Sequence, residues 1–196
     1  MAKDLHITGN AESDALLSTD PLALLIGMLL DQQIPMETAF SGPLKLRDRL
    51  GALDASTIAS HDPNEFVAVM KQSPSVHRFP GSMAGRVQSM CAAIVADWGG
   101  DASAIWTSGS PTGAEVFDRL KALPGFGEQK AKIFVALLGK QRGLDAPGWE
   151  DASAPYSEPG SYRSVADIVD PESLGRVREF KRAAKAAAKN AAAKNG

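Results

Sequence analysis

The segment with the clearest chemical potential is Leu123-Pro-Gly-Phe-Gly127, which lies between two stretches of helical periodicity. Its two glycines flank one apolar residue, and glycine permits the positive φ that lets neighbouring amides point outward together. The helix that follows adds unpaired N-terminal amides and the positive end of its dipole. Phe126 is expected to point inward and hold the two helices together. The segment therefore predicts a neutral seat for a phosphate group, built from backbone amides.

Other glycine turns bind nucleotides, but they need features that this sequence lacks. A dinucleotide-binding turn or a P-loop follows a strand and carries further glycines or a Gly-Lys-Ser/Thr sequence. The segment before Leu123 is instead predicted to be a helix that begins with the capping box Thr112-Gly-Ala-Glu115. An ordinary turn between two helices remains the alternative to a phosphate seat.

The elements that would position this turn are helices, because almost no stretch alternates apolar and polar residues with a period of two. The most apolar helix, Leu22 to Leu30, is capped by Asp20 with Pro21 at its first position. It is apolar nearly all round, so it must be buried, and it turns abruptly polar at Asp31-Gln32-Gln33. We expect an all-α fold.

The remaining chain is expected to contain further helices and one long irregular stretch. Pro43 is expected to mark a bend or the start of a new helix. Residues 139–164 are rich in Pro, Gly and Ser, with no clear period. The other helices are expected over 54–59, 63–71, 83–98, 112–120 and 128–138, and from Pro171 onward.

Composition excludes several classes of protein. The chain has 196 residues, which fits one domain or two small lobes that share a core. A single cysteine excludes a disulfide framework, a cysteine-based zinc site and a protein-ligated iron–sulfur cluster. The three histidines lack metal-ligand spacing and are expected on the surface or in loops. With no apolar run long enough to span a bilayer and no signal-peptide core, the chain is expected to be cytoplasmic.

The charges are unevenly distributed along the chain. Residues 171–196 contain seven basic and two acidic residues, whereas residues 1–170 contain 14 basic and 21 acidic ones. A basic tail on an acidic body indicates a polyanionic partner. A solvated helical spacer is the alternative, because the tail is built largely from alanine and lysine.

Three segments together resemble the helix–hairpin–helix (HhH-GPD) DNA glycosylases of base excision repair, the superfamily of endonuclease III and the 3-methyladenine glycosylases. Leu123-Pro-Gly-Phe-Gly-Glu-Gln-Lys-Ala131 is similar to the hairpin, and Asp20 to Ile34 to the buried helix with its glutamine loop. Ser82 to Cys91 is similar to the long helix that precedes the hairpin helices. The resemblance covers about residues 12–140, so this chain resembles a short form with a divergent C-terminal part.

The resemblance implies a bilobal all-α fold, with double-stranded DNA carrying a damaged base bound between the lobes. The hairpin would grip the DNA backbone, and the damaged base would rotate out of the stack into a pocket. Gln33, with Gln32 beside it, matches the polar residue that fills the gap. The alternative is that both glutamines only cap a helix end. The DNA-binding residues implied are Gln32, Gln33, Leu123, Gly125, Phe126, Gly127, Gln129 and Lys130.

The chemistry implied is hydrolysis without strand cleavage. Bifunctional relatives carry a nucleophilic lysine at the second residue after the last glycine of the hairpin, which here is Gln129. An amide cannot form a Schiff base, so water should be the nucleophile. Lys130 lies one residue on, about 100° around the helix, and is expected to face phosphate or solvent.

The sequence departs from the family at the position of the catalytic carboxylate. The family's aspartate lies some residues beyond the hairpin, where this sequence has Pro147 or Trp149. Asp151 is the preferred catalytic candidate because it follows a turn and an aromatic residue, and Asp145 is the second. Glu150 also flanks this position, and the alternative is that all three are surface carboxylates of a loop. Asp31, at the end of the buried helix, is held in reserve.

The domain organisation expected is one HhH-GPD-like helical domain over residues 1–165, followed by a C-terminal helix and basic Ala/Lys tail over 166–196. We expect no cofactor, although the hairpin carbonyls leave room for a monovalent cation. A monomer without membrane contact is expected, associated with the nucleoid if the source is bacterial. Two rival functions stay open: a non-catalytic protein that binds the DNA backbone or damage, and a helical interaction module.

Overall fold

The computed structural model describes residues 3–194, with side chains as far as residue 191. Helices form its regular structure, and no strand occurs in that range, so the predicted all-α fold is confirmed. The first group of helices comprises α1 (Ala11–Thr19), α2 (Pro21–Leu30), α3 (Met36–Leu50), α4 (Ala55–Ser60), α5 (Pro63–Lys71) and α6 (Pro80–Trp98). The second comprises α7 (Ala104–Thr107), α8 (Gly113–Lys121), α9 (Glu128–Gln141), α10 (Trp149–Ser153), a 3₁₀ turn, η1 (Val165–Asp167), and α11 (Pro171–Lys194).

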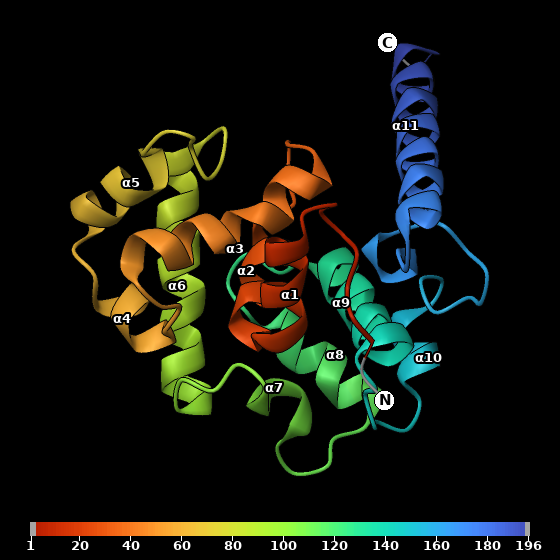
Figure 1. Cartoon of the computed structure of the whole chain (residues 1–196). Helices are drawn as coiled ribbons and strands as arrows, with labels where there is room; N and C mark the ends of the chain where they lie inside the picture. The colour runs from red at the N-terminus through yellow and green to blue at the C-terminus, as the bar shows by residue number, and fades with distance from the viewer. Residues whose placement is uncertain (1–2, 195–196) are drawn as a thin grey trace.

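The two groups lie side by side, with α2 and α3 between α4–α6 and α8–α10 (Figure 1). Every residue of α2 after Pro21 is buried, as its sequence predicted. Its start is also as predicted, because the Asp20 carboxylate accepts hydrogen bonds from the amides of Leu22 and Ala23 at 2.8 and 3.2 Å. Because α2 is packed on all sides, its position in the protein is fixed. The loop at 31–34, which follows it directly, is therefore held in place as well.

The helix α3 corrects one expectation, because it runs without interruption through Pro43. Proline removes one backbone donor and is usually excluded from helix interiors. Here the ring is buried and becomes part of the core. Gly42 beside it lets the helix approach its neighbours, since a Cβ atom at this residue would lie 2.6 Å from Leu30 Cδ1. Close packing of α3 against α2 therefore tolerates the lost hydrogen bond.

The stretch at 139–164, for which the sequence predicted no regular structure, carries α10 and ends beside η1. Trp149 fixes the start of α10 in space. A Cβ atom at Gly139 would lie 2.3 Å from its indole, and one at Gly113 would lie 2.4 Å from its Cα atom. Two glycines on α9 and α8 thus make room for α10, a long-range relation with no local sequence signal.

The helix α11 has two parts. Its first turns contribute Leu174 and Val177 to the core, together with Val165, Ala166 and Ile168 of the preceding segment. The hydrophobic core therefore continues past residue 165, which is the boundary expected from the sequence between the helical domain and the C-terminal helix. From residue 178 to residue 191 no residue is buried, and this part of α11 stands away from the rest of the molecule (Figure 1). Lys194 of the predicted basic tail lies outside the described side chains.

Candidate DNA-binding site

The hairpin between α8 and α9 is anchored by apolar contacts. Leu123 and Phe126 are buried, and the Phe126 amide donates to the Leu123 carbonyl at 3.0 Å. The Phe126 ring meets the Phe134 ring edge to face, with centroids 6.0 Å apart. Phe126 thus points inward, as the sequence predicted, and it ties the hairpin to α9. The two glycines between and after these anchors, Gly125 and Gly127, are exposed.

The amides at the tip of the hairpin have no acceptor within the described part of the chain. They belong to Gly125, Gly127 and the first turn of α9, Glu128 to Lys130. The Glu128 carboxylate does not cover them, because it pairs with Lys132 along the helix at 2.9 Å. The hydrogen bond from Lys132 also lowers the pKa of Glu128. Free amides at the positive end of a helix dipole are the groups from which the sequence predicted a phosphate seat.

The two glycines of this seat are required for different reasons. Gly125 has φ of 84°, and a Cβ atom there would lie 2.4 Å from Leu29 Cδ1 of α2. The fold itself therefore demands glycine at 125. Gly127 has φ of −91°, which any residue adopts, and a Cβ atom there would meet open space. No contact within the described protein accounts for glycine at 127, whereas a ligand that approaches the backbone closely would.

Lys130 connects the hairpin helix to the end of α2. Its Nζ atom donates to the carbonyls of Met28 and Leu29 at 2.7 and 2.8 Å. Burial lowers the pKa of Lys130 to about 8, against a smaller opposing effect of the Asp31 carboxylate. The sequence placed this lysine toward phosphate or solvent, but the structure turns it inward, where it caps the C-terminus of α2. Its contacts bring Asp31 and the amide seat into one region.

In the loop after α2, the Gln33 side chain is exposed, whereas the Gln32 side chain is hydrogen-bonded to the protein. Gln32 donates to the Leu29 carbonyl at 2.8 Å, and its Oε1 atom accepts from Arg86 of α6 at 2.6 Å. Gln33 is exposed, has φ of 59° and forms no side-chain hydrogen bond within residues 3–194. Such a backbone conformation is uncommon and costly for a residue other than glycine, and it holds the Gln33 side chain at the tip of the loop.

His77 holds a second exposed side chain beside this loop. It lies in the loop between α5 and α6, one of the two places expected for the histidines, but it is buried there and bridges two segments. Its Nδ1 atom accepts from the Phe79 amide at 3.0 Å, so Nε2 carries the proton and donates to the Gln32 carbonyl at 3.0 Å. The Phe79 ring is 43% exposed, which is unusual for a phenylalanine. Sequence reasoning missed His77 and Arg86 because their partner Gln32 lies 45 and 54 residues away in the chain, and it missed Phe79 because His77 connects it to that loop.

A pocket of about 350 Å³ opens between the α2–α3 loop and α11. Two carboxylates line it, each 18% exposed and each paired with a basic residue of α11. Asp31 accepts from Lys181 Nζ at 3.3 Å, and Glu37 pairs with Arg178. Of the carboxylates considered from the sequence, Asp31 lies closest in the chain to the contacts that join α2 to the hairpin.

The structure does not bring Asp145 to the hairpin. It is exposed beyond the C-terminus of α9, beside Arg142. The 14 residues of α9 place that end about 20 Å from the hairpin. Asp151 is exposed on α10, and none of its side-chain atoms forms a hydrogen bond or ion pair with the hairpin among the described contacts. Tyr156, further along the chain, reaches the first turn of α9. There the Tyr156 hydroxyl accepts from Gln129 Nε2 at 3.0 Å.

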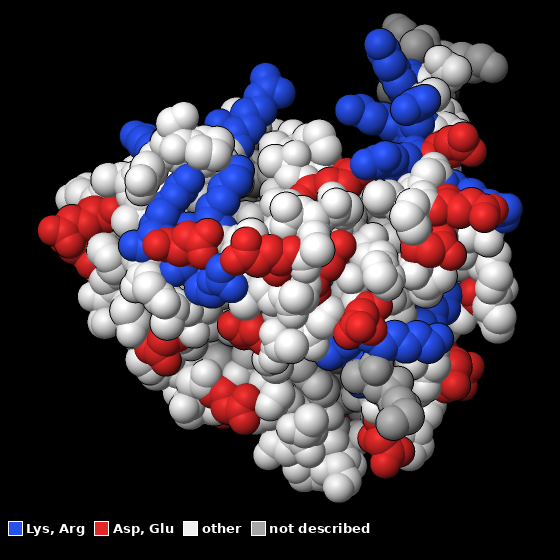
Figure 2. All heavy atoms as spheres, in the orientation of Figure 1, with Lys and Arg blue, Asp and Glu red and all other residues white. Residues whose placement is uncertain are grey.

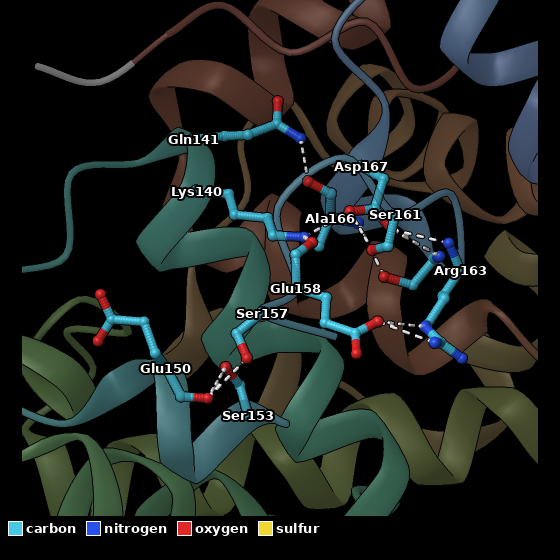
Figure 3. Close-up of polar contacts among 11 residues, drawn as sticks. Lys140, Gln141, Glu150, Ser153, Ser157, Glu158, Ser161, Arg163, Ala166 and Asp167 are labelled. Carbon is cyan, nitrogen blue, oxygen red and sulfur yellow. Dashed lines mark hydrogen bonds and ion pairs between the residues drawn. The ribbon is translucent and has the colours of Figure 1, made fainter. Parts of the chain in front are cut away.

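A second cavity of about 520 Å³ lies at the far end of α9. Its main charged groups are paired with one another, whereas the buried Gln141 Oε1 atom has no hydrogen-bond partner among the described residues. Figure 3 shows Lys140 and Asp167 pointing toward one another there, with Nζ and Oδ1 2.6 Å apart. Asp167 also accepts from Ser161 Oγ and from the amides of Arg163 and Ser164, at 2.8–3.2 Å. This buried carboxylate is saturated, so it stabilises the segment around it.

Cys91, the single cysteine, is buried in α6. Burial raises the pKa of its thiol to about 12, so it stays protonated and unreactive. Among residues 3–194, no single helix has the length and apolar character needed to cross a membrane.

Comparison with known proteins agrees with the geometry. No curated protein matches this chain, and no solved structure does. A family model described as HhH-GPD superfamily base excision DNA repair protein matches residues 26–194. The match includes the hairpin and the loop at 31–34, and it extends through α11, well past residue 140, where the resemblance seen in the sequence ended. The chain therefore belongs to the HhH-GPD superfamily of base excision DNA repair proteins.

Proposed function

We propose that this protein is a monofunctional DNA N-glycosylase, which hydrolyses the bond between a damaged base and its deoxyribose and leaves the strand intact. The family implies base excision repair of the glycosylase type. The main support for hydrolysis by this protein is that three features lie close together. The free amides of the hairpin, the exposed Gln33 and the half-buried Asp31 are linked through the contacts of Gly125 and Lys130 with α2.

The free amides at Gly125 and Gly127 would bind a backbone phosphate next to the lesion without reading sequence. Rotation of the damaged nucleotide out of the stack leaves a gap in the duplex. Gln33 suits that gap because its amide both donates and accepts hydrogen bonds. The exposed Phe79 ring, held to the same loop through His77, supplies an apolar surface for the neighbouring base pair.

Asp31 is the carboxylate that we assign to the chemical step. As the C1′–N bond breaks, the electron pair leaves with the base and positive charge develops on the sugar. A carboxylate stabilises that charge, as in glycoside hydrolysis, and accepts the proton of the attacking water. The water oxygen forms the new bond to C1′, and the departing base takes up a proton. The product is an abasic site.

Strand cleavage by an amine is not expected. Gln129 occupies the position after the hairpin where bifunctional relatives carry lysine, and its side chain donates to Tyr156. Lys130 is the neighbouring amine, but its Nζ atom is occupied by two carbonyls of α2. Borohydride should therefore trap no covalent adduct between the protein and abasic DNA. An adduct that disappears in Lys130→Met would overturn this assignment.

The proposal is tested with duplexes that each carry one damaged base. Strand breaks that appear only after alkali treatment support hydrolysis to an abasic site. Asp31→Asn should then slow base release by about a hundredfold or more. Glu37→Gln is the matched control, because Glu37 lines the same pocket and has the same exposure. It should stay within a few fold of the parent protein.

Asp151→Asn tests the candidate preferred from the sequence. If it abolishes base release while Asp31→Asn does not, the catalytic role belongs to Asp151 and the glycosylase activity stands. The alternative function is a non-catalytic protein that binds damaged DNA. The pairing of Asp31 with Lys181 favours it, since a carboxylate engaged by an ammonium group is less available to water. Tight binding to a lesion without base release from any duplex would establish that alternative.

A further inference from the structure

We infer that the outer part of α11 is a second DNA-binding element, which contacts the phosphates of one duplex arm beyond the lesion. The inference rests on the proposed function only in taking double-stranded DNA as the ligand of the hairpin. It concerns what we term the basic stripe, a set of side chains on one face of α11. The stripe consists of Arg178, Lys181, Arg182, Lys185 and Lys189.

The spacing of these five residues places them on one side of the helix. At the rotation of an α-helix they fall within an arc of about 100°. The opposite side from residue 183 onward carries only alanine and Asn190 among the described side chains. Figure 2 shows Lys and Arg side chains gathered along the part of α11 that stands away from the molecule.

The outer three members of the stripe, Arg182, Lys185 and Lys189, do not serve the stability of the protein itself. No residue from 178 to 191 is buried, and from 182 onward every described residue is exposed, so this outer part of the helix gains little from packing. Arg182, Lys185 and Lys189 form no ion pair with any described residue. Like charges three or four residues apart destabilise an isolated helix. These three charges therefore cost stability in the free protein, and an anionic surface would remove that cost.

The stripe is continuous with the proposed site. Its first two members, Arg178 and Lys181, reach Glu37 and Asp31 at the pocket beside the α2–α3 loop. From there the stripe extends about 16 Å along α11, the length of roughly five base pairs of DNA. A duplex gripped at the hairpin would therefore have one arm within reach of the stripe. A regular array of phosphates is the surface that such an array of cations fits best.

The test uses binding to undamaged duplex DNA at several salt concentrations. The neutralised variant combines Arg182→Gln, Lys185→Gln and Lys189→Gln. If the three residues each contact a phosphate, the logarithmic salt slope should become shallower by about 2–3, and affinity at low salt should fall by tenfold or more. Unchanged affinity and slope would overturn the inference, even if the helix binds anionic vesicles or an acidic protein.

A second variant separates the position of the charges from their number. It combines Arg182→Ala, Lys185→Ala and Lys189→Ala with Ala183→Arg, Ala187→Lys and Ala191→Lys. Net charge is preserved, while the charged face rotates by about half a turn. This variant should bind as weakly as the neutralised one. Binding as tight as that of the parent protein would show that only net charge matters, and would refute the stripe.

Duplexes truncated on one side complete the test. Shortening the arm that meets α11 to fewer than about five base pairs should abolish the difference between parent and neutralised variant. Shortening the other arm should leave it intact, and equal effects of the two truncations would overturn the inference. Base release from damaged duplexes is measured separately on the parent protein, so failure of the proposed catalysis would be visible without affecting these binding results.

Discussion

The hairpin at 122–127 and the segment from Arg142 to Asp170 are both irregular connections in the second group of helices, yet opposite kinds of contact stabilise them. The hairpin buries apolar side chains and leaves its amides exposed and unpaired. In the longer segment, polar groups are hydrogen-bonded to other groups of the protein, above all at Asp167. The first connection therefore leaves donors free for a ligand, as the proposed function requires, whereas the second uses its polar groups to hold α9, α10 and α11 together.

The largest expected effect is a loss of stability caused by a substitution in the segment from Arg142 to Asp170. Asp167→Ala would leave Lys140 and two backbone amides without their acceptor in a site where the carboxylate is 3% exposed. Removing one partner from a buried, hydrogen-bonded pair costs about 3–5 kcal/mol of unfolding free energy. Urea denaturation measures the change.

The control for Asp167 is a pair in the same segment. Glu158 pairs with Arg163 at 2.8 Å, with side chains 58% and 37% exposed. Glu158→Gln should change the unfolding free energy by less than about 1 kcal/mol, as is usual for surface pairs. If both variants lose the same stability, polar saturation does not distinguish this segment from the hairpin.

The next effect compares the two glycines of the hairpin. Gly125→Ala places a side chain at φ of 84° and against Leu29, so it should lose about 2–3 kcal/mol of stability. Gly127→Ala meets neither constraint and should stay within about 0.5 kcal/mol of the parent. Equal losses in the two variants would mean that the fold requires both glycines, and that Gly127 carries no separate requirement for a ligand.

This pair of connections also shows what the sequence can predict. The hairpin was recognisable because its signals are local: a proline, two glycines, a capped helix before them and a helical period after them. The helix α10 was missed because it depends on space left by Gly113 and Gly139, which are distant in the sequence. The same reason explains the inward turn of Lys130, whose partners lie 101 and 102 residues away. Interactions over such distances leave no periodic pattern in a single sequence.

A smaller effect is expected on ligand binding. Gly127→Asp should fold normally, because a Cβ atom at this residue meets open space. A carboxylate at the anion seat would repel phosphate and obstruct the amides, so affinity for duplex DNA should fall by tenfold or more, about 1.4 kcal/mol. Ser56→Asp, exposed in the first turn of α4, controls for the added charge in the binding assay without backbone strain. A Gly127→Asp variant that binds as tightly as this control would show that phosphate does not occupy the seat.

The smallest effect concerns the link between hairpin and α2. Burial lowers the pKa of Lys130 from 10.5 to about 8. Between these values the unfolded chain binds a proton that the folded protein does not, so stability rises with pH in this interval. Below pH 8 both states are protonated and the contribution is constant. We expect the parent protein to gain about 1 kcal/mol over Lys130→Arg between pH 8 and pH 9.5.

Arginine is the informative replacement at this position, because it keeps the charge and the donors but does not titrate in that range. Other groups that titrate contribute equally to both proteins and cancel in the difference. Parallel stability curves would show that Lys130 is solvated rather than buried against the end of α2. In that case the contacts that bring Asp31 next to the amide seat would be weaker than the structure indicates, and the assignment of Asp31 would lose its main support.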